Sequence, residues 1–215
     1  DLEFYNYVLP KLGSSAAHLD PKKQGRCIAE VFGAFGWHEG LREMKWIADH
    51  FLVRGVNWFV PHAFSMAAFP DWDCPPHFYA HSQNPQFAHF GQLMSYMNRT
   101  ATLLSGGCAA CPVAILYHAD AEWAGDAMPI ERVAAELTRA QIDFDFVPAE
   151  AFEDEGRYEV SIADGMLTVN DCRYRAFVMP GASFIGSATA QAVRRMMDAG
   201  VMVLAADEVP NALYD

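Results

Sequence analysis

The sequence predicts an α/β protein in which the last βα units of a (β/α)8 barrel precede a doubly wound parallel sheet. Three observations lead to this prediction: short apolar segments alternate with helical patterns, glycine turns join them, and two such strands precede a long proline-rich segment. Short apolar strands that alternate with helices are typical of parallel sheets. We therefore expect residues 1–107 to be the C-terminal part of a barrel and residues 108–215 to form a second domain.

The first part has the helix–strand order of parallel βα units. Residues 2–19 carry apolar side chains at helical spacing, Leu2 and Tyr5 among them, and Pro10 is expected to kink or split this helix. A short strand at residues 27–32 precedes an amphipathic helix at residues 38–53 and a strand at residues 56–61. A further helix is expected at residues 87–104, after the proline-rich segment.

The second part continues the same alternation after a boundary expected near residues 105–111. The dipeptide Asp164-Gly165 separates two short apolar runs and predicts a hairpin. The main strands are expected at residues 113–117, 144–147, 176–179 and 201–205, and the main helices at residues 129–140 and 187–198.

The first part is too short to be a complete barrel. A barrel needs roughly 200–250 residues, and two parallel strands do not form a stable domain alone. Either the other strands lie upstream of Asp1, or this segment packs onto the second domain. The chain opens on Asp1 without an initiator methionine, so we expect an excised piece of a longer protein, whose localisation the sequence leaves unknown.

Composition excludes several classes of partner. The chain is 52% hydrophobic and 20% charged, enough for a core, and its formal net charge is -12. Nucleic acids and anionic membranes attract basic surfaces, so neither is an expected partner. No apolar run approaches the roughly 18–20 residues that cross a bilayer.

We expect no metal and no cofactor. The five cysteines are scattered, which favours free thiols in a reducing compartment. Cys108 and Cys111 have the spacing of a redox or zinc motif, but no second pair accompanies them and a strand follows, so we interpret them as loop cysteines. The paired histidines and aspartates of residues 71–81 lack a metal-binding pattern, and neither G-x-G-x-x-G nor a P-loop occurs.

Glu30 is the strongest candidate for a catalytic group. It lies within an apolar strand near its carboxyl end, just before Gly33. Barrel enzymes place catalytic groups at the carboxyl ends of strands, and glycoside hydrolysis needs carboxylates whose pKa the surroundings control. We expect Glu30 to be half-buried. The alternative is a structural glutamate paired with an arginine or with backbone amides.

A sugar pocket is predicted around this carboxylate. His62 ends the next strand and is placed to bond a substrate hydroxyl or to orient Glu30, although a structural role is the alternative. Residues 57–90 are rich in aromatic side chains and histidines, and sugar rings pack their C–H faces on aromatic rings. Trp37 and Trp58 flank the strand ends, so we predict that His62, Trp37 and Trp58 bind substrate.

The stretches Glu30-Val31-Phe32-Gly33-Ala34-Phe35-Gly36-Trp37 and Gly55-Val56-Asn57-Trp58-Phe59-Val60-Pro61-His62-Ala63-Phe64 resemble the last barrel strands of large glycoside hydrolases. The likeness covers roughly residues 10–105 and is strongest to bacterial α-L-rhamnosidase-like and related glycosyl hydrolases. It implies that Glu30 is catalytic, as nucleophile or general base, and that His62 lies beside the sugar. The second carboxylate is expected upstream.

The stretch Ala176-Phe177-Val178-Met179-Pro180-Gly181-Ala182 begins with a predicted strand and precedes the helix that ends before Gly200. With these features the second part resembles the class I glutamine-amidotransferase-like (flavodoxin-like) domain appended to several glycosidases, including the oligomerisation domain of some β-galactosidases. Amidotransferases carry a Gly-x-Cys-x-Gly motif, whereas Cys172 lies in Asn170-Asp171-Cys172-Arg173. The resemblance therefore implies a structural or assembly role, with a homo-oligomer as an open expectation.

Two hypotheses follow from the sequence. In the first, the chain is part of a glycoside hydrolase that acts on a carbohydrate, such as a rhamnoside or galactoside, and the isolated chain is inactive. In the second, it is a non-catalytic α/β scaffold for oligomerisation or ligand binding. Sugar, linkage and stereochemical outcome stay open.

Overall fold

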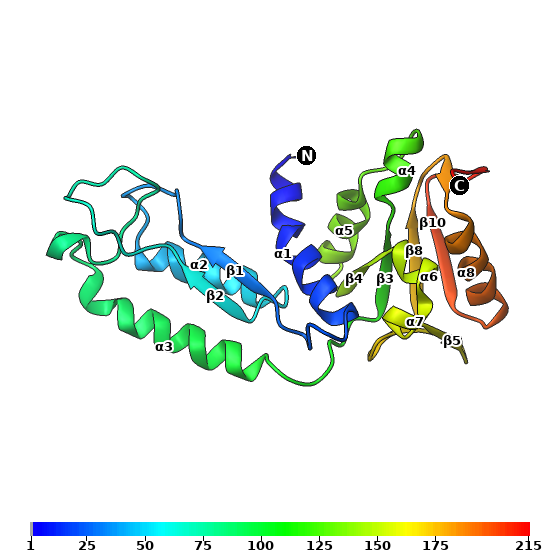
Figure 1. Cartoon of the computed structure of the whole chain (residues 1–215), viewed down its shortest axis with the longest axis horizontal. Helices are drawn as coiled ribbons and strands as arrows, with labels where there is room; N and C mark the ends of the chain where they lie inside the picture. Colours follow the sequence, from blue (N-terminus) through cyan, green and yellow to red (C-terminus); the bar gives the residue numbers. More distant parts are fainter. Residues whose placement is uncertain (1) are drawn as a thin grey trace. The chain divides into compact units, whose positions relative to one another are not determined.

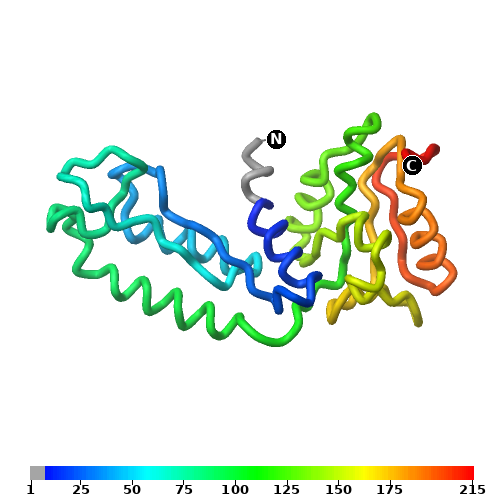
Figure 2. The backbone as a smooth tube through the Cα atoms, in the orientation of Figure 1, coloured from blue at the N-terminus to red at the C-terminus, as the bar shows by residue number. Residues whose placement is uncertain are grey.

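The computed structural model describes residues 2–215, with side chains from Val8 onward (Figures 1 and 2). The side chains of Leu2 and Tyr5, used above to predict the first helix, lie outside this range. The chain forms two compact units, one of residues 26–106 and one that joins the residues up to Gly25 with residues 107–215. Among the described residues, no helix has the length and apolarity needed to span a membrane.

The unit of residues 26–106 is built on a pair of parallel strands. Strands β1 (Ile28–Val31) and β2 (Trp58–Pro61) pair with Glu30 opposite Val60. Helix α2 (Leu41–Leu52) connects the two strands and packs with helix α3 (Phe87–Leu103). The long segment between β2 and α3 contains only the short 3-10 helix η1 (Ala80–Ser82).

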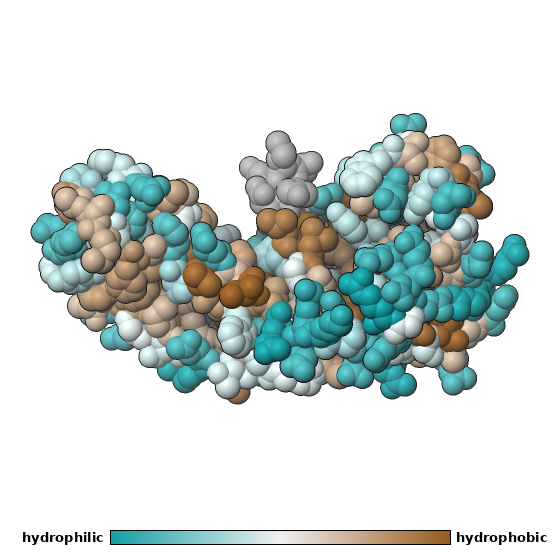
Figure 3. Space-filling model, in the orientation of Figure 1, coloured by the Kyte–Doolittle hydropathy of each residue, from teal (hydrophilic) through white to brown (hydrophobic). Residues whose placement is uncertain are grey.

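The two faces of this strand pair differ sharply in burial. Side chains alternate between the faces of a strand. Val31 faces a core formed with α2 and α3, and Ala29 and Phe59 pack against it. The other face is uncovered within this unit, and brown, apolar surface is visible over this part of the chain in Figure 3. It exposes Ile28 by 64%, Trp58 by 54% and Val60 by 49%, with Glu30 beside them.

The other unit is centred on a parallel four-stranded sheet in the order β10-β8-β3-β4. A three-stranded antiparallel sheet, β5-β6-β7, and a short parallel pair, β9 and β11, accompany it. The helices are α1 (Leu2–Leu19), α4 (Ala119–Ala124), α5 (Ile130–Arg139), α6 (Glu150–Glu153), α7 (Glu155–Tyr158) and α8 (Ser187–Asp198). The strands are β3 (Val113–Tyr117), β4 (Phe144–Pro148), β5 (Ser161–Ala163), β6 (Met166–Val169), β7 (Cys172–Tyr174), β8 (Ala176–Pro180), β9 (Phe184–Ile185), β10 (Met202–Ala206) and β11 (Ala212–Leu213).

Two cores cover the two faces of the central sheet. Ile115 and Val178 belong to a core with α1 and α5, whereas Phe177 and Met179 belong to a second core with α6 and α8. Figure 1 shows the positions of these helices around the sheet. Strands buried on both faces need apolar side chains at every position, which explains the continuous apolar runs in the sequence. The prediction of an α/β chain with a parallel sheet is therefore confirmed.

The predicted hairpin is present as well. Asp164 and Gly165 connect β5 and β6 with φ values of 51° and 72°. Type I′ hairpin turns, whose twist matches that of the flanking strands, require positive φ at both central residues. Aspartate followed by glycine is one of the pairs favoured there.

The structure differs from the sequence prediction at the first helix. We expected residues 1–107 to group together, but α1 packs on β4 and α5 of the other unit. Pro10 also does not divide this helix, which runs unbroken from Leu2 to Leu19. Val8 and Ser15, which lie on either side of the proline, are buried against the central four-stranded sheet. Tertiary contacts of this kind can outweigh the low helix propensity of proline.

Candidate active site at the carboxyl ends of β1 and β2

The loops that follow β1 and β2 are linked to each other by backbone hydrogen bonds. The amide of His62 donates to the carbonyl of Val31 at 2.8 Å, so the chain after β2 continues beside the end of β1. Further along, the amide of Gly36 donates to the carbonyl of Pro75 at 2.9 Å, and that of Phe78 to Ala63 at 3.0 Å. The predicted site residues therefore lie on two loops that hold each other in place.

The backbone just after Glu30 is in an unusual conformation. Phe32 and Ala34 have φ values of 77° and 67°, which side chains with a Cβ rarely adopt. Phe32 is fully buried in the core with α2 and α3, and this packing holds the turn. Strained backbone that the core maintains is common at functional sites, so the end of β1 is a suitable place for one.

Glu30 itself is exposed, which corrects the expectation of a half-buried carboxylate. It lies on the uncovered face of the strand pair, so nothing in residues 26–106 buries it. Within the described part of the chain its side chain makes no hydrogen bond or ion pair. The alternative of a structural glutamate paired with an arginine therefore has no support in this unit.

His62 and Trp37 come together around a third ring, that of His77. The ring centroid of His77 is 6.3 Å from that of His62 and 5.4 Å from that of Trp37. The His62 ring also packs on Gly33, where an added Cβ would lie 3.1 Å from its Cγ, so a larger residue would require the ring to shift by a few tenths of an ångström. His62 Nδ1 and Trp37 Nε1 are buried and have no partner among the described residues. Unpaired buried nitrogens need an explanation, and a ligand or water would satisfy them.

His77 is one of the histidines of the aromatic segment of residues 57–90, and the structure places its ring beside those of His62 and Trp37. It is 3% exposed, and its Nε2 lies 2.9 Å from the carbonyl oxygen of Asp73. Its Nδ1 is 3.8 Å from the carboxylate of Asp71, which also accepts a hydrogen bond from Ser65 that lowers the pKa of Asp71. These loop contacts hold the His77 ring next to His62 and Trp37, the two predicted sugar-binding residues.

Trp58 does not join this cluster. It is the first residue of β2 and pairs with Ile28, so it lies at the amino end of the strand. It shares the uncovered face with Glu30 but lies at the opposite end of the strand pair from Trp37, so its predicted contact with substrate stays a prediction.

Glu39 is a buried acid that the sequence analysis missed. It is 4% exposed, and neither carboxylate oxygen has a partner among the described residues. Burial, with a smaller contribution from Glu43, raises the pKa of Glu39 to about 7. It borders a small cavity of 10 Å³ with Phe78, Asn84 and Phe90. An acidic residue just before a helix usually caps it in solvent, so nothing in the sequence marks this one as buried.

Replacing Glu39 with glutamine should change how stability depends on pH. The folded state holds the proton up to about pH 7, and the unfolded state releases it near 4.5, so stability falls as pH rises between these values. We expect Glu39→Gln to be more stable than the parent at pH 8, by on the order of 2–3 kcal/mol, and equal to it at pH 4. Urea unfolding at the two pH values measures this.

The exposed neighbour Glu43 supplies the control for this measurement. Because Glu43 makes only the smaller contribution to the raised pKa of Glu39, Glu43→Gln should flatten the pH profile slightly, by no more than about 0.5 kcal/mol. Parallel profiles for Glu39→Gln and the parent would show that the Glu39 carboxyl is solvated and ordinary.

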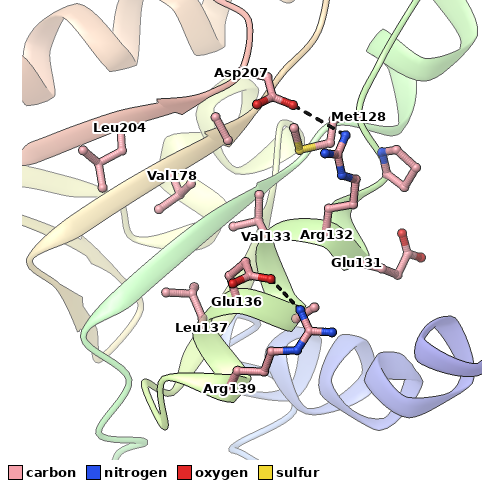
Figure 4. A pocket seen from close by; sticks show the side chains of 13 residues that line it. Met128, Glu131, Arg132, Val133, Glu136, Leu137, Arg139, Val178, Leu204 and Asp207 are labelled. Carbon is pink, nitrogen blue, oxygen red and sulfur yellow. Dashed lines mark hydrogen bonds and ion pairs between the residues drawn. The ribbon is translucent and has the colours of Figure 1, made fainter. Parts of the chain in front are cut away.

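A larger cavity lies in the other unit, and its lining is mostly apolar. It has a volume of about 870 Å³ and lies between α5 and the strands β8 and β10 (Figure 4). Val133, Val178 and Leu204 form apolar walls, and the charged groups at its rim pair with one another. These pairs are Arg132 with Asp207 at 3.5 Å and Arg139 with Glu136. It is an apolar groove without aromatic side chains, where the sheet face beyond α5 is uncovered.

One group of potential metal ligands also lies in that unit. His18, Cys111 and Asp145 place their ligand atoms within 4.8 Å of one another. The Lys11 ammonium, however, lies 3.7 Å from both the Cys111 sulfur and an Asp145 oxygen. Asp145 already accepts hydrogen bonds from Ser15 and Tyr174. The geometry is that of a buried ion network in which lysine supplies the cation.

Comparisons with known proteins identify the family. The model of the alpha-L-rhamnosidase family (glycoside hydrolase family 106) matches residues 9–212. The solved structure of a rhamnosidase from Novosphingobium sp. PP1Y has a similar fold, with a TM-score of 0.58 and 18% identity. The match covers 96% of this chain and 20% of that one, so this chain spans about a fifth of that protein. No curated protein matches the sequence. Since the family match covers nearly the whole chain, the chain belongs to the alpha-L-rhamnosidase family of glycoside hydrolases.

Proposed function

We propose that this chain is part of a larger α-L-rhamnosidase and that Glu30 is one of the catalytic carboxylates of its barrel. The family match over residues 9–212 supports the reaction class. The substrate would be an α-L-rhamnoside, although the sequence alone left galactosides open as well.

The observation that carries the proposal is the uncovered face of β1 and β2. In a (β/α)8 barrel, one face of each strand is covered by helices and the other points into the barrel. Here α2 and α3 cover one face, while Ile28, Glu30 and Val60 are exposed on the other. Apolar side chains exposed on a parallel strand pair need a partner layer, and the remaining barrel strands would provide it. Glu30 would then point into the barrel near its carboxyl end.

The geometry suggests how the site would work. Glu30 would act as nucleophile in a retaining enzyme or as general base in an inverting one, and its distance from the second carboxylate decides between them. That second carboxylate is proposed to lie outside these 215 residues. The unpaired nitrogens of His62 and Trp37 would bond sugar hydroxyls, with His77 holding both rings in place. Trp58 would offer an aromatic surface at the other end of the same strand face.

The second unit is proposed to be flavodoxin-like with an assembly role. In chain order its four parallel strands are β3, β4, β8 and β10, and their spatial order places β3 between β4 and β8. This is the start of the flavodoxin-like order 2-1-3-4-5. A likeness to glutamine-amidotransferase-like domains stays a prediction, as does a homo-oligomer. The scaffold alternative for the whole chain draws on the open apolar groove beside α5.

The full-length enzyme that contains this chain should release nitrophenol from nitrophenyl α-L-rhamnoside. We expect a rate at least about tenfold higher than on the matching β-D-galactoside, because a pocket built for one set of hydroxyls leaves polar groups unpaired with another. The 215-residue chain alone should show no turnover. A preference for the galactoside would contradict the proposed substrate, and no turnover of any glycoside by the full-length protein would favour the scaffold.

A further inference from the structure

We propose that the C-terminal unit carries a second, non-catalytic carbohydrate-binding site, in a cavity at the carboxyl ends of β3 and β4. The cavity has a volume of about 360 Å³, within the range of roughly 300–1,000 Å³ of small-molecule sites. Its lining includes Tyr117, the last residue of β3, and Pro148, the last residue of β4. In open parallel sheets, ligands bind outside the carboxyl ends of the strands. The proposal is independent of Glu30 and of the proposed hydrolysis.

One side of the cavity is apolar and aromatic. Leu12, Ala16 and Leu19 of α1 form one wall, and Phe146 and Pro148 of β4 form another. Tyr117 is 38% exposed, so a ligand can reach its ring. The C–H face of a sugar ring packs on a surface of this kind.

The rim of the cavity is polar, with charges of both signs. Asp20, Lys23, Arg157 and Tyr158 line it. Arg157 bonds Glu150 at 2.7 Å and lies 3.9 Å from Asp20, and the Tyr158 hydroxyl donates to Glu150 at 3.1 Å. Lys23 and Arg157 are balanced by Asp20 on the rim and by Glu150, which pairs with Arg157 just outside the cavity lining, so the rim has no net charge. It therefore suits a neutral ligand rich in hydroxyl groups better than a phosphate or a carboxylate.

The side chains at the rim are partly ordered before any ligand arrives. Arg157 lies over the Tyr158 ring with its guanidinium carbon 4.9 Å from the centroid, and the side chain of Asp20 is only 17% exposed. Preformed polar groups reduce the entropy lost on binding. The groove beside α5 is larger but has no aromatic side chain, and the cavity next to Glu39 has room for little more than a water molecule. The cavity at β3 and β4 combines volume, an aromatic surface and a mixed polar rim, which neither of those two cavities does.

NMR titration of the 215-residue chain with L-rhamnose and with a rhamnose disaccharide tests the proposal. We expect saturable shift changes that map to the residues lining the cavity. Ala16 is exposed on α1 and borders the cavity, so Ala16→Trp should fill it and weaken binding at least tenfold. Tyr117→Ala removes the aromatic surface and should have a similar effect, which covers the case that Ala16→Trp does not fold. Trp123→Ala is the control, because Trp123 on α4 is 84% exposed and outside the cavity.

Three results would overturn the proposal. The first is an absence of saturable shifts at the cavity with either sugar. The second is unchanged sugar affinity in the folded Ala16→Trp and Tyr117→Ala variants. The third is saturation of the cavity by inorganic phosphate where the sugars have no effect, since an anion site would need the rim to be positive. The readout is binding, so loss of the proposed hydrolase activity would leave the result intact.

Discussion

Glu30→Gln in the full-length enzyme is expected to reduce kcat on the rhamnoside by about 10²–10⁴-fold, the contribution typical of a positioned acid–base group. Glutamine has nearly the same shape but can neither accept a proton from water nor attack the sugar. Because Glu30 is exposed on the strand face and makes no ion pair within the described residues, the substitution should leave folding unchanged. Steady-state kinetics with far-UV circular dichroism provide the measurement.

Glu43→Gln is a suitable control for this experiment. Glu43 is an exposed glutamate on α2 of the same unit, so its loss tests the general effect of removing one negative charge. It should alter kcat less than about twofold, as expected for a surface substitution. Full activity of folded Glu30→Gln would place the chemistry on other residues. The anomeric configuration of the first product of the parent enzyme, followed by NMR, separates the nucleophile from the general base.

Asp145→Ala is expected to destabilise the C-terminal unit by about 3–5 kcal/mol, because it removes the buried counter-charge of Lys11 and leaves His18 and Tyr174 without their acceptor. Asp145 is fully buried on β4, and its oxygens lie 2.9 Å from His18 Nδ1 and 3.0 Å from the Tyr174 hydroxyl. Burial alone would raise the pKa of Asp145, but the bonds from His18 and the charge of Lys11 outweigh it and lower the pKa to about 2. The stabilisation is therefore present above the ordinary value of 3.8 and disappears as pH falls towards 2.

The same network explains why α1 packs on this unit. Lys11, Ser15 and His18 lie on one side of the helix and all reach Asp145. Hydrogen exchange should therefore show that α1 loses protection in Asp145→Ala before the central sheet does. Urea unfolding gives the free energy.

Asp143→Ala is the matched control for Asp145→Ala. Asp143 also pairs with Lys11, at 2.9 Å, but its side chain is 56% exposed, and exposed ion pairs contribute only about 0–1 kcal/mol. A loss of stability in Asp145→Ala no larger than in Asp143→Ala would contradict the network.

Much of the strand and helix pattern could be predicted from the sequence. The parallel sheet was predictable because strands buried on both faces require unbroken apolar runs, such as Val113–Tyr117 and Ala176–Pro180. The hairpin at Asp164 was predictable because few residues tolerate its backbone conformation. Glu30 could be singled out because a charged residue in an apolar strand is unusual. These signals depend on neighbours within a few residues.

Tertiary structure alone decided which surfaces meet and which residues are buried. The apolar face of α1 indicates that the helix packs on another element. The sequence does not say which one, because its polar partner Asp145 lies more than 100 residues away on the central sheet. Glu39 is buried because the loop of residues 62–86 folds over it, and the sequence did not mark it. Glu30 was expected to be half-buried but is exposed, because no element of its unit covers it. His77 joins His62 and Trp37 only through loop contacts. The sequence determined the local elements because their signals are short-range, and burial and the site required long-range packing, which no local pattern contains.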